Sequence, residues 1–142
     1  MADKYASLKL SNQLCFPLYA TSKEIVKRYK PYLDEIGLTY TQYITMMVLW
    51  EHKELNVKEL GNYLYLDSGT LTPLLKKLEE KGYIKRVRDA HDERNVIISL
   101  TKEGSKLKDK ALKIPEAMAD CVNLSEEESK VLYKLLYKLL EK

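Results

Sequence analysis

The sequence predicts a mainly α-helical fold with a small β-wing, the winged helix-turn-helix. Three features of residues 64–101 predict it: an amphipathic helix that begins at Ser68, a helix stop at Gly82, and two strands joined by a charged tip. A helix of this kind fits the major groove of DNA, and the charged loop beside it fits the backbone or the minor groove. The pattern therefore indicates that the chain binds DNA.

The recognition helix and the wing each have a local basis in the sequence. Ser68 can cap the helix with its hydroxyl, and four leucines follow at helical spacing: Leu71, Leu74, Leu75 and Leu78. Gly82 ends the helix because glycine adopts positive φ without strain. Strands are predicted at 83–88 and 95–100, where β-branched and apolar residues gather, and the polar residues 89–94 form the tip.

Three helices are predicted before the recognition helix. The first opens at Ser11 or Asn12, and Pro17 gives it an early kink or a late start because proline lacks the N–H that would bond to residue 13. The second spans 41–51 and is rich in apolar residues, so we expect it to be buried. Asn56 caps the third, which supports the recognition helix.

Two further helices are predicted after the wing. Thr101 opens a lysine-rich helix that runs to about Cys121, and the run Ser125-Glu126-Glu127-Glu128 forms a capping box for the last helix. That last helix has a wide apolar stripe: Val131, Leu132, Leu135, Leu136, Leu139 and Leu140. A small domain cannot bury both this stripe and the apolar face of 8–18, so the terminal helices are predicted to join two chains in a homodimer.

The predicted organisation is a single domain over 1–142. Its winged helix-turn-helix core covers about 41–100, and its dimerisation helices cover about 8–35 and 101–142. A length of 142 residues with 45% hydrophobic content suits one globular domain with its own core.

Neither a membrane span nor an export signal is predicted. The sequence lacks an uninterrupted apolar run of about 18 residues, and residues 1–13 carry charge without a secretory apolar stretch, so we expect a cytoplasmic protein. The net charge is only +3, but basic residues concentrate in one stretch that contains Lys76, Lys77, Lys81, Lys85, Arg86, Arg88 and Arg94. Acidic residues are mixed in, so an ordinary solvated face is the alternative to a nucleic-acid surface.

The two cysteines exclude several kinds of site. Cys15 and Cys121 are too few and too far apart for a disulfide framework or a zinc site. No metal, cofactor or catalytic residue is predicted, and the chain is not expected to be an enzyme. A lone cysteine in apolar sequence is most often a packing residue, but Cys15 lies near a helix N-terminus, where the dipole favours a thiolate.

Several motifs resemble the multiple-antibiotic-resistance-regulator (MarR) family. They are the helix DSGTLTPLLKKLEEKGYI, the wing tip DERN and the segment ISLTKEG. More narrowly, LCFPLYATSKEI and YLDSGTLTPLLKKLE are similar to the organic-hydroperoxide-sensing repressors of that family, and the similarity extends over 13–140. The resemblance implies a dimeric transcriptional repressor that binds double-stranded DNA and responds to an organic hydroperoxide. A dimer implies an inverted-repeat operator.

Position and resemblance together identify candidate DNA contacts. Ser68, Thr70 and Thr72 lie on the first turns of the recognition helix, where hydroxyls reach base edges or phosphates. The resemblance assigns Arg94 to the minor groove, with Asp92 holding its guanidinium. Lys76 and Lys77 are expected to contact phosphates, and Arg86 either contacts DNA or is an ordinary charge at the strand edge. Asp67 is expected to orient the turn or cap the helix, with a base contact as the second choice.

The resemblance makes Cys15 the redox-sensing residue, with thiolate-supporting tyrosines at Tyr19, Tyr29 and Tyr40. The chain has 11 tyrosines and one phenylalanine, and phenol donors stabilise a thiolate. Cys15 and Tyr29 are 14 residues apart, about 21 Å on a straight helix. Tyr19 can reach Cys15 from the same helix, whereas Tyr29 is expected to come from the other subunit of an antiparallel pair.

Cys121 has two interpretations within this resemblance. It is a resolving cysteine that attacks oxidised Cys15 across the dimer, which we favour, or it is a packing residue and a low-molecular-weight thiol caps Cys15 instead.

Two other functions stay open at this point. A thiol peroxidase would also use an activated cysteine, but it would need neither a recognition helix nor a wing. A MarR-type repressor induced by a lipophilic or phenolic ligand would keep its response without Cys15.

Overall fold

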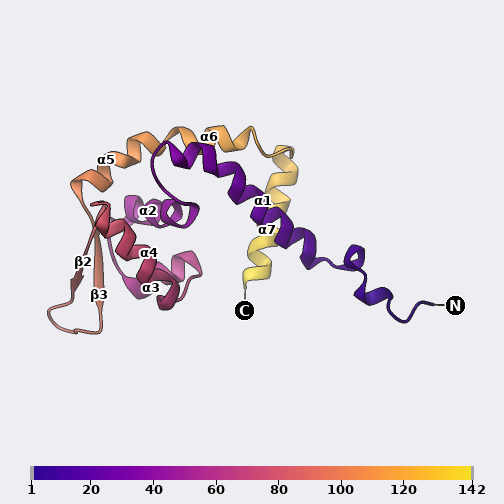
Figure 1. Ribbon diagram of the computed structural model, residues 1–142, viewed down its shortest axis with the longest axis horizontal. Helices are drawn as coiled ribbons and strands as arrows, with labels where there is room; N and C mark the ends of the chain where they lie inside the picture. The colour runs from indigo at the N-terminus through magenta and orange to yellow at the C-terminus, as the bar shows by residue number, and fades with distance from the viewer. Residues whose placement is uncertain (1, 142) are drawn as a thin grey trace.

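The computed structural model describes residues 2–141 and places most of them in helices. In chain order the helices are α1 (Cys15–Asp34), α2 (Tyr40–His52), α3 (Val57–Leu64), α4 (Ser68–Glu80), α5 (Lys102–Ala111), α6 (Lys113–Ala119) and α7 (Glu126–Leu140). The strands are β1 (Glu54–Asn56), β2 (Ile84–Arg88) and β3 (Val96–Leu100), and 3₁₀ turns precede α1 at Ala6–Leu8 and Leu10–Asn12. The predicted fold class, mainly helical with a small β-wing, is confirmed (Figure 1).

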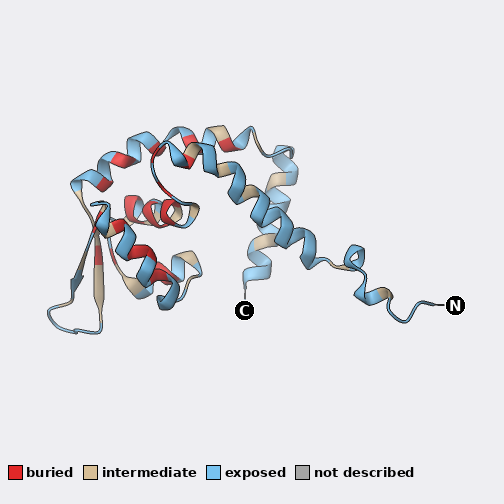
Figure 2. Ribbon diagram, in the orientation of Figure 1, coloured by how far each residue is buried: buried red, intermediate tan, exposed pale blue. Residues whose placement is uncertain are grey.

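The buried residues concentrate on α2 and on the faces of α4 and α5 that turn toward it (Figure 2). The expected second helix is therefore confirmed as buried, and Met46 and Leu49 have no exposed surface. Thr39 begins α2 with a capping box that includes Gln42. Packing of this helix against its neighbours fixes the platform that carries the DNA-reading elements.

Gly104, in the first turn of α5, lies close against the rest of the core. Its carbonyl accepts a hydrogen bond of 2.9 Å from Nε1 of Trp50 in α2. A Cβ atom at this position would lie 2.2 Å from the backbone oxygen of Tyr83, which is far inside van der Waals contact. Only glycine therefore allows α5 to begin at this depth.

The wing is a three-stranded antiparallel sheet in the order β1-β3-β2. In its register, Ile98 on the central strand faces Leu55 on one side and Arg86 on the other. The two predicted strands of the wing are confirmed to within one residue at their first positions. Strand β1 was not predicted, because its three residues form a strand only by pairing with β3.

The recognition helix α4 begins at Ser68 as predicted, and its N-terminus distinguishes the two predicted caps. Asp67, and not Ser68, is the cap: its Oδ1 accepts the backbone N–H of Thr70 at 2.7 Å, and Ser68 is the first helical residue. The carboxylate reaches the free amides of the first turn from one residue further back. At the other end Gly82 has φ of +82°, and Gly82 and Tyr83 donate their N–H groups back into the last turn, as expected.

Helix α1 begins at Cys15, later than the expected opening at Ser11 or Asn12. The residues before it form 3₁₀ turns, and no side chain caps the helix. Pro17 lies in the first turn, where its missing N–H would have no helical partner. Of the two expected effects of Pro17, the late start is confirmed.

The lysine-rich helix expected to run from Thr101 to about Cys121 is interrupted. Thr101 caps it as predicted, but α5 ends at Ala111 and α6 begins at Lys113. Pro115 explains the break, since it has no N–H to give to the carbonyl of Ala111 four residues before it. The capping boxes at Asn56 and Ser125 form as predicted.

The N-terminal segment, α1 and α7 carry most of the large exposed apolar side chains of the described chain. Helix α6 packs along α1, while the N-terminal segment extends away from the body and α7 buries no residue (Figures 1 and 2). Exposed apolar side chains are Leu8, Leu10, Leu14, Phe16 and Leu18 at one end and Val131, Leu132, Leu135, Leu139 and Leu140 at the other. Within 2–141, no helix is both long enough and apolar enough to cross a membrane.

Candidate DNA-binding face and thiol site

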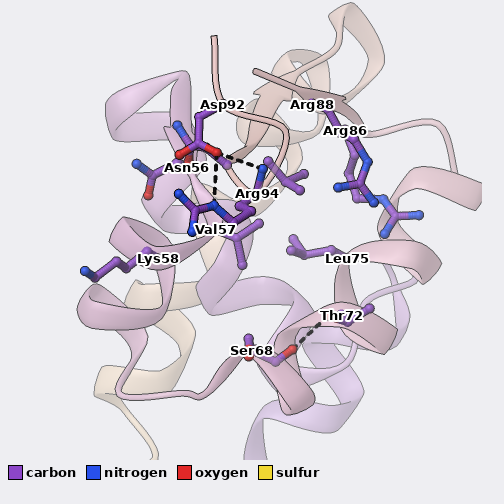
Figure 3. Close-up of a pocket in the computed structure, with 12 residues that line it drawn as sticks. Asn56, Val57, Lys58, Ser68, Thr72, Leu75, Arg86, Arg88, Asp92 and Arg94 are labelled. Carbon is purple, nitrogen blue, oxygen red and sulfur yellow. Dashed lines mark hydrogen bonds and ion pairs between the residues drawn. The ribbon is translucent and has the colours of Figure 1, made fainter. Parts of the chain in front are cut away.

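A basic hollow of about 670 Å³ separates the helix-turn-helix from the wing (Figure 3). The start of α3, the exposed side of α4 and the wing strands with their tip form its walls. Its lining is Asn56, Val57, Lys58, Ser68, Thr72, Leu75, Arg86, Arg88, Asp92, Arg94, Asn95 and Val96. Four cationic side chains and one carboxylate give this face a positive balance, which suits a phosphate backbone.

Helix α4 presents its hydroxyls on two sides. Ser68 and Thr72 are one turn apart and line the hollow, and the Thr72 hydroxyl donates to the Ser68 carbonyl at 2.8 Å. Thr70 and Lys77 are exposed on the other side of the helix, away from the hollow. Lys76, one turn after Thr72, is also exposed. The first two turns of α4 therefore offer hydroxyls that a nucleic acid can reach.

Asp67 caps the N-terminal end of α4. Its hydrogen bonds, first of all from the backbone N–H of Thr70, hold the pKa of the carboxyl below its ordinary value. An ionised carboxylate at a helix N-terminus is also favoured by the helix dipole. This geometry agrees with the capping role that the sequence placed ahead of a base contact.

The wing tip is organised by two carboxylates. Asp92 Oδ1 accepts the backbone N–H of Arg94 at 3.0 Å and its Nε at 3.4 Å, while 93% of the Arg94 side chain stays exposed. Asp89, which the sequence interpretation missed, accepts from the backbone of His91 and the amide of Asn95, and these bonds lower the pKa of Asp89. The tip is thus fixed locally, and the Arg94 guanidinium, paired through Nε with Asp92, stays exposed to solvent.

Two other arginines of the wing are engaged within the chain. Arg86 forms an ion pair of 3.0 Å with Glu79 of α4, and this pair lowers the pKa of Glu79. Arg88 donates to the backbone oxygen of Glu93 at 2.7 Å. Lys58, in the first turn of α3, lines the hollow and was not identified from the sequence, although its position just after the Asn56 cap marks it as a helix N-terminal cation.

Cys15 lies at the exposed N-terminal end of α1. In the described part of the chain no hydrogen bond joins it to a tyrosine, and the spacing to Tyr29 along α1 corresponds to about 21 Å. Tyr19 is 61% exposed, and the ammonium of Lys23 lies 5.3 Å from its ring centroid. A single chain therefore does not bring Cys15 to Tyr29.

Tyr29 and Tyr40 lie together at the other end of α1. Their ring centroids are 4.9 Å apart, and Tyr43 lies 5.9 Å from Tyr29 in the same cluster. Burial raises the pKa of all three phenols, and for Tyr40 and Tyr43 the neighbouring phenols raise it further. The hydroxyls therefore stay protonated at neutral pH and remain hydrogen-bond donors. Tyr43 was not identified as a site residue, since its helical spacing is that of a core residue.

Cys121 is half-buried just after α6, against the same half of α1. Its Sγ lies 3.9 Å from the hydroxyl of Tyr32, and its backbone carbonyl accepts a hydrogen bond of 2.9 Å from Nη1 of Arg28. Arg28 and Tyr32 flank Tyr29 in sequence, so Cys121 shares one end of α1 with the tyrosine cluster. Cys15 occupies the opposite end of that helix.

The chain is similar to known transcriptional regulators. A family model for the transcriptional regulator SarA/Rot matches residues 27–111. The organic hydroperoxide resistance transcriptional regulator of Bacillus subtilis is 52% identical over 141 residues, which cover 99% of this chain and 96% of that protein.

Several solved structures are similar to this chain over nearly its whole length. Reduced AbfR of Staphylococcus epidermidis bound to DNA is 36% identical, with a TM-score of 0.78 over 96% of this chain and 95% of that one. AbfR with a disulfide formed has a TM-score of 0.67, with 97% of each chain covered. A mutant of Escherichia coli MarR complexed with operator DNA has a TM-score of 0.82 at 23% identity, over 99% and 100% of the two chains, and shows the fold alone.

Proposed function

We propose a function for this chain from one premise: it belongs to the MarR family of transcriptional regulators, in the organic-hydroperoxide-sensing branch. It is a homodimeric repressor that binds operator DNA and releases it when Cys15 is oxidised. The observation that carries the DNA-binding part is the basic hollow, where the first turns of α4 and the exposed guanidinium of Arg94 share one face. Such a protein acts in the cytoplasm, where its DNA lies.

On DNA, α4 enters the major groove and the wing tip follows the backbone. The hydroxyls of Ser68 and Thr72 reach base edges or phosphates, and the N-terminus of α4 favours a phosphate. Arg94 enters the minor groove, where a narrow A·T-rich groove attracts a guanidinium. Arg86 lines this face, and its ion pair with Glu79 ties the wing to α4.

The dimer forms through α1, the N-terminal segment and α7. These elements expose large apolar side chains at both ends of the chain, a surface that a monomer in water has no means to cover. A two-fold axis through them sets two α4 helices about 34 Å apart, one turn of DNA. The operator is therefore an inverted repeat with half-sites about one helical turn apart.

The sensor is assembled from both subunits. When the two α1 helices pair antiparallel, Cys15 of one chain meets the end of the other that carries the partner's Tyr29 and the partner's Tyr40. The Cys15 thiolate sulfur attacks the hydroperoxide, so that an S–O bond forms and the O–O bond breaks. The alkoxide leaves as an alcohol after taking a proton, and the sulfur, oxidised by two electrons, is left as a sulfenic acid.

The same pairing supports the resolving role for Cys121. Because Cys121 contacts Arg28 and Tyr32, it lies at the end of α1 that the partner's Cys15 would approach in an antiparallel pair. Its thiolate attacks the sulfenic sulfur, an S–S bond forms, and the S–O bond breaks, so that hydroxide leaves as water after taking a proton. AbfR, solved both reduced on DNA and with a disulfide formed, offers a precedent within the relatives.

The alternatives are distinguishable from this proposal. A thiol peroxidase turns over many hydroperoxide molecules with a reductant, whereas a sensor reacts once for each signal, and the relatives are named as regulators. A ligand-induced repressor would respond to its inducer in the Cys15→Ser variant.

The experiment that tests the proposal is a gel shift on the promoter nearest the gene, with and without an organic hydroperoxide. Reduced protein is expected to bind, and oxidised protein to release. Cys15→Ser is expected to bind equally well and to stay bound after oxidation. Normal release by Cys15→Ser would show that the cysteine is not the sensor.

A further inference from the structure

Cys121 is held by two side chains of α1 that come from far away in the sequence. Arg28 donates through Nη1 to the Cys121 carbonyl at 2.9 Å, across 93 residues, and the Tyr32 hydroxyl lies 3.9 Å from Sγ, across 89 residues. The two are four residues apart and therefore lie on one face of the helix, one turn from each other. Arg28 therefore contacts the backbone of Cys121, and Tyr32 contacts its sulfur.

We infer that Arg28 and Tyr32 are positioning residues for the resolving step, and this inference rests on the proposed function. They hold Cys121 against the stretch of α1 where an antiparallel partner helix delivers its oxidised Cys15. Neither residue touches the hydroperoxide, and neither acts on the first oxidation. Their effect is confined to the attack of Cys121 on the sulfenic sulfur.

The backbone around Cys121 needs such a restraint. The segment between α6 and α7 has no helical ladder, and beside the Arg28 contact the N–H of Cys121 bonds only to the Met118 carbonyl. The guanidinium of Arg28 is itself oriented by Glu24, whose Oε1 lies 3.6 Å from Nε. Arg28 therefore fixes where along α1 the Cys121 backbone sits.

The hydroxyl of Tyr32 orients the sulfur. As a thiol, Cys121 donates to the carbonyl of Ala117 at 3.5 Å. When the sulfur loses its proton this bond is lost, and the phenol of Tyr32 remains as the donor beside it. Proximity to Cys121 is the first cause of the raised pKa of Tyr32, so the phenol keeps the proton that it donates. A thiolate held by one donor keeps other lone pairs free for attack.

The test separates the two chemical steps in the full-length protein. After one equivalent of tert-butyl hydroperoxide, sulfenic acid at Cys15 is trapped with a dimedone tag in the Cys121→Ser background. The covalent dimer is followed on non-reducing gels in the background with both cysteines. The variants are Tyr32→Phe, Arg28→Met and Arg28→Lys. Lys30→Met is the control, because Lys30 lies on the same helix and, within residues 2–141, pairs only with Asp34.

Loss of one of these hydrogen bonds is expected to slow covalent dimer formation about 3- to 10-fold in Tyr32→Phe and Arg28→Met. Arg28→Lys keeps a cationic donor and should recover part of the rate. Sulfenic acid formation should stay within about twofold of the parent in every variant. Lys30→Met should match the parent in both steps, and thermal midpoints of all variants should remain close together.

Three results would overturn the inference. If the parent forms the covalent dimer and both variants form it equally fast, Arg28 and Tyr32 do not position Cys121, although the proposed function stands. If sulfenic acid formation falls together with the dimer, the two residues act on Cys15 instead. If the parent leaves DNA without any covalent dimer, the resolving role of Cys121 is wrong and the inference falls with it.

Discussion

Lys81 donates through Nζ to Oε1 of Gln42 at 3.2 Å and also to the carbonyl of Gly37. Lys81 is the residue that ends the recognition helix α4, and Gln42 belongs to the first turn of α2. Gln42 is only 4% exposed and its side chain also caps α2 by accepting from the backbone of Thr39. One lysine therefore ties the end of α4 to the turn between α1 and α2.

Lys81→Met should lower stability while leaving the fold intact. The substitution removes two charge-assisted hydrogen bonds but keeps the length of the side chain, and the expected loss is about 1–2 kcal/mol of unfolding free energy. Urea denaturation followed by circular dichroism measures it. Lys76→Met, on the exposed side of the same helix, is the control; equal stability of the two variants would contradict the prediction.

Arg94→Ala should weaken DNA binding by about 1–3 kcal/mol, because the minor-groove contact is lost and the protein fold is not touched. Fluorescence anisotropy with an operator duplex at several salt concentrations measures the change. Lys85→Ala provides the comparison, since Lys85 is exposed on the wing but does not line the hollow. An Arg94→Ala protein with unchanged affinity would remove the wing from the interface.

Tyr29→Phe and Tyr40→Phe should slow the oxidation of Cys15 about 3- to 10-fold without reducing affinity for DNA. Each substitution removes one phenol donor from the predicted inter-subunit site and keeps the ring contacts of the cluster. Stopped-flow detection of the sulfenic acid gives the rate. Tyr83→Phe, outside the cluster, should behave as the parent does, and a parental rate in both cluster variants would speak against a shared site.

Asp67 should make stability depend on acid pH. Its pKa is lowered in the folded chain, so its contribution is present above the ordinary value of 3.8 and is lost as the pH falls through the lower folded value. Asp67→Asn keeps a capping oxygen but cannot titrate, so its thermal midpoint should fall less steeply than the parent's as the pH drops below about 4. Asp67→Ala loses the cap and should unfold at a lower temperature at neutral pH as well. Parallel pH profiles for the parent and Asp67→Asn would refute the assignment.

Leu135→Glu should convert the dimer to a monomer and abolish tight binding to a full operator. Leu135 is 51% exposed on the apolar side of α7, and a carboxylate there would be buried without a partner in the interface. Sedimentation velocity gives the oligomeric state. Lys138→Glu reverses a charge on the same helix away from the stripe and should remain dimeric, so a dimeric Leu135→Glu would exclude α7 from the interface.

Most of the local structure could be predicted from the sequence, because its causes lie within a few residues of each other. The leucines of α4, the stop at Gly82 and the box at Ser125 are of this kind, and the structure bears them out. Asp67 and Ser68 are both good caps for α4, and only the backbone geometry shows that Asp67 is the one used. Pro115 marks the break before α6, through which the lysine-rich helix was predicted to continue.

The rest depends on contacts that sequence spacing does not encode. Strand β1 exists because Leu55 meets Ile98, and Arg28 meets Cys121 only because α6 folds back along α1. The pairing of Arg86 with Glu79 likewise needs the strand to return against the helix. Site residues on α4 and the wing could be located from the sequence, whereas what each one touches could not.

The lack of a side chain at residue 104 limits how this regulator can be re-engineered. Any Cβ there would press on the Tyr83 carbonyl, at the point where the chain leaves α4 for the wing. A substitution would therefore change the tilt of the wing relative to α4. Through the hydrogen bond to Trp50, it would also change the position of α2. Libraries that aim at new operator preference can vary the exposed residues of α4 and the wing, but they must keep glycine at this position.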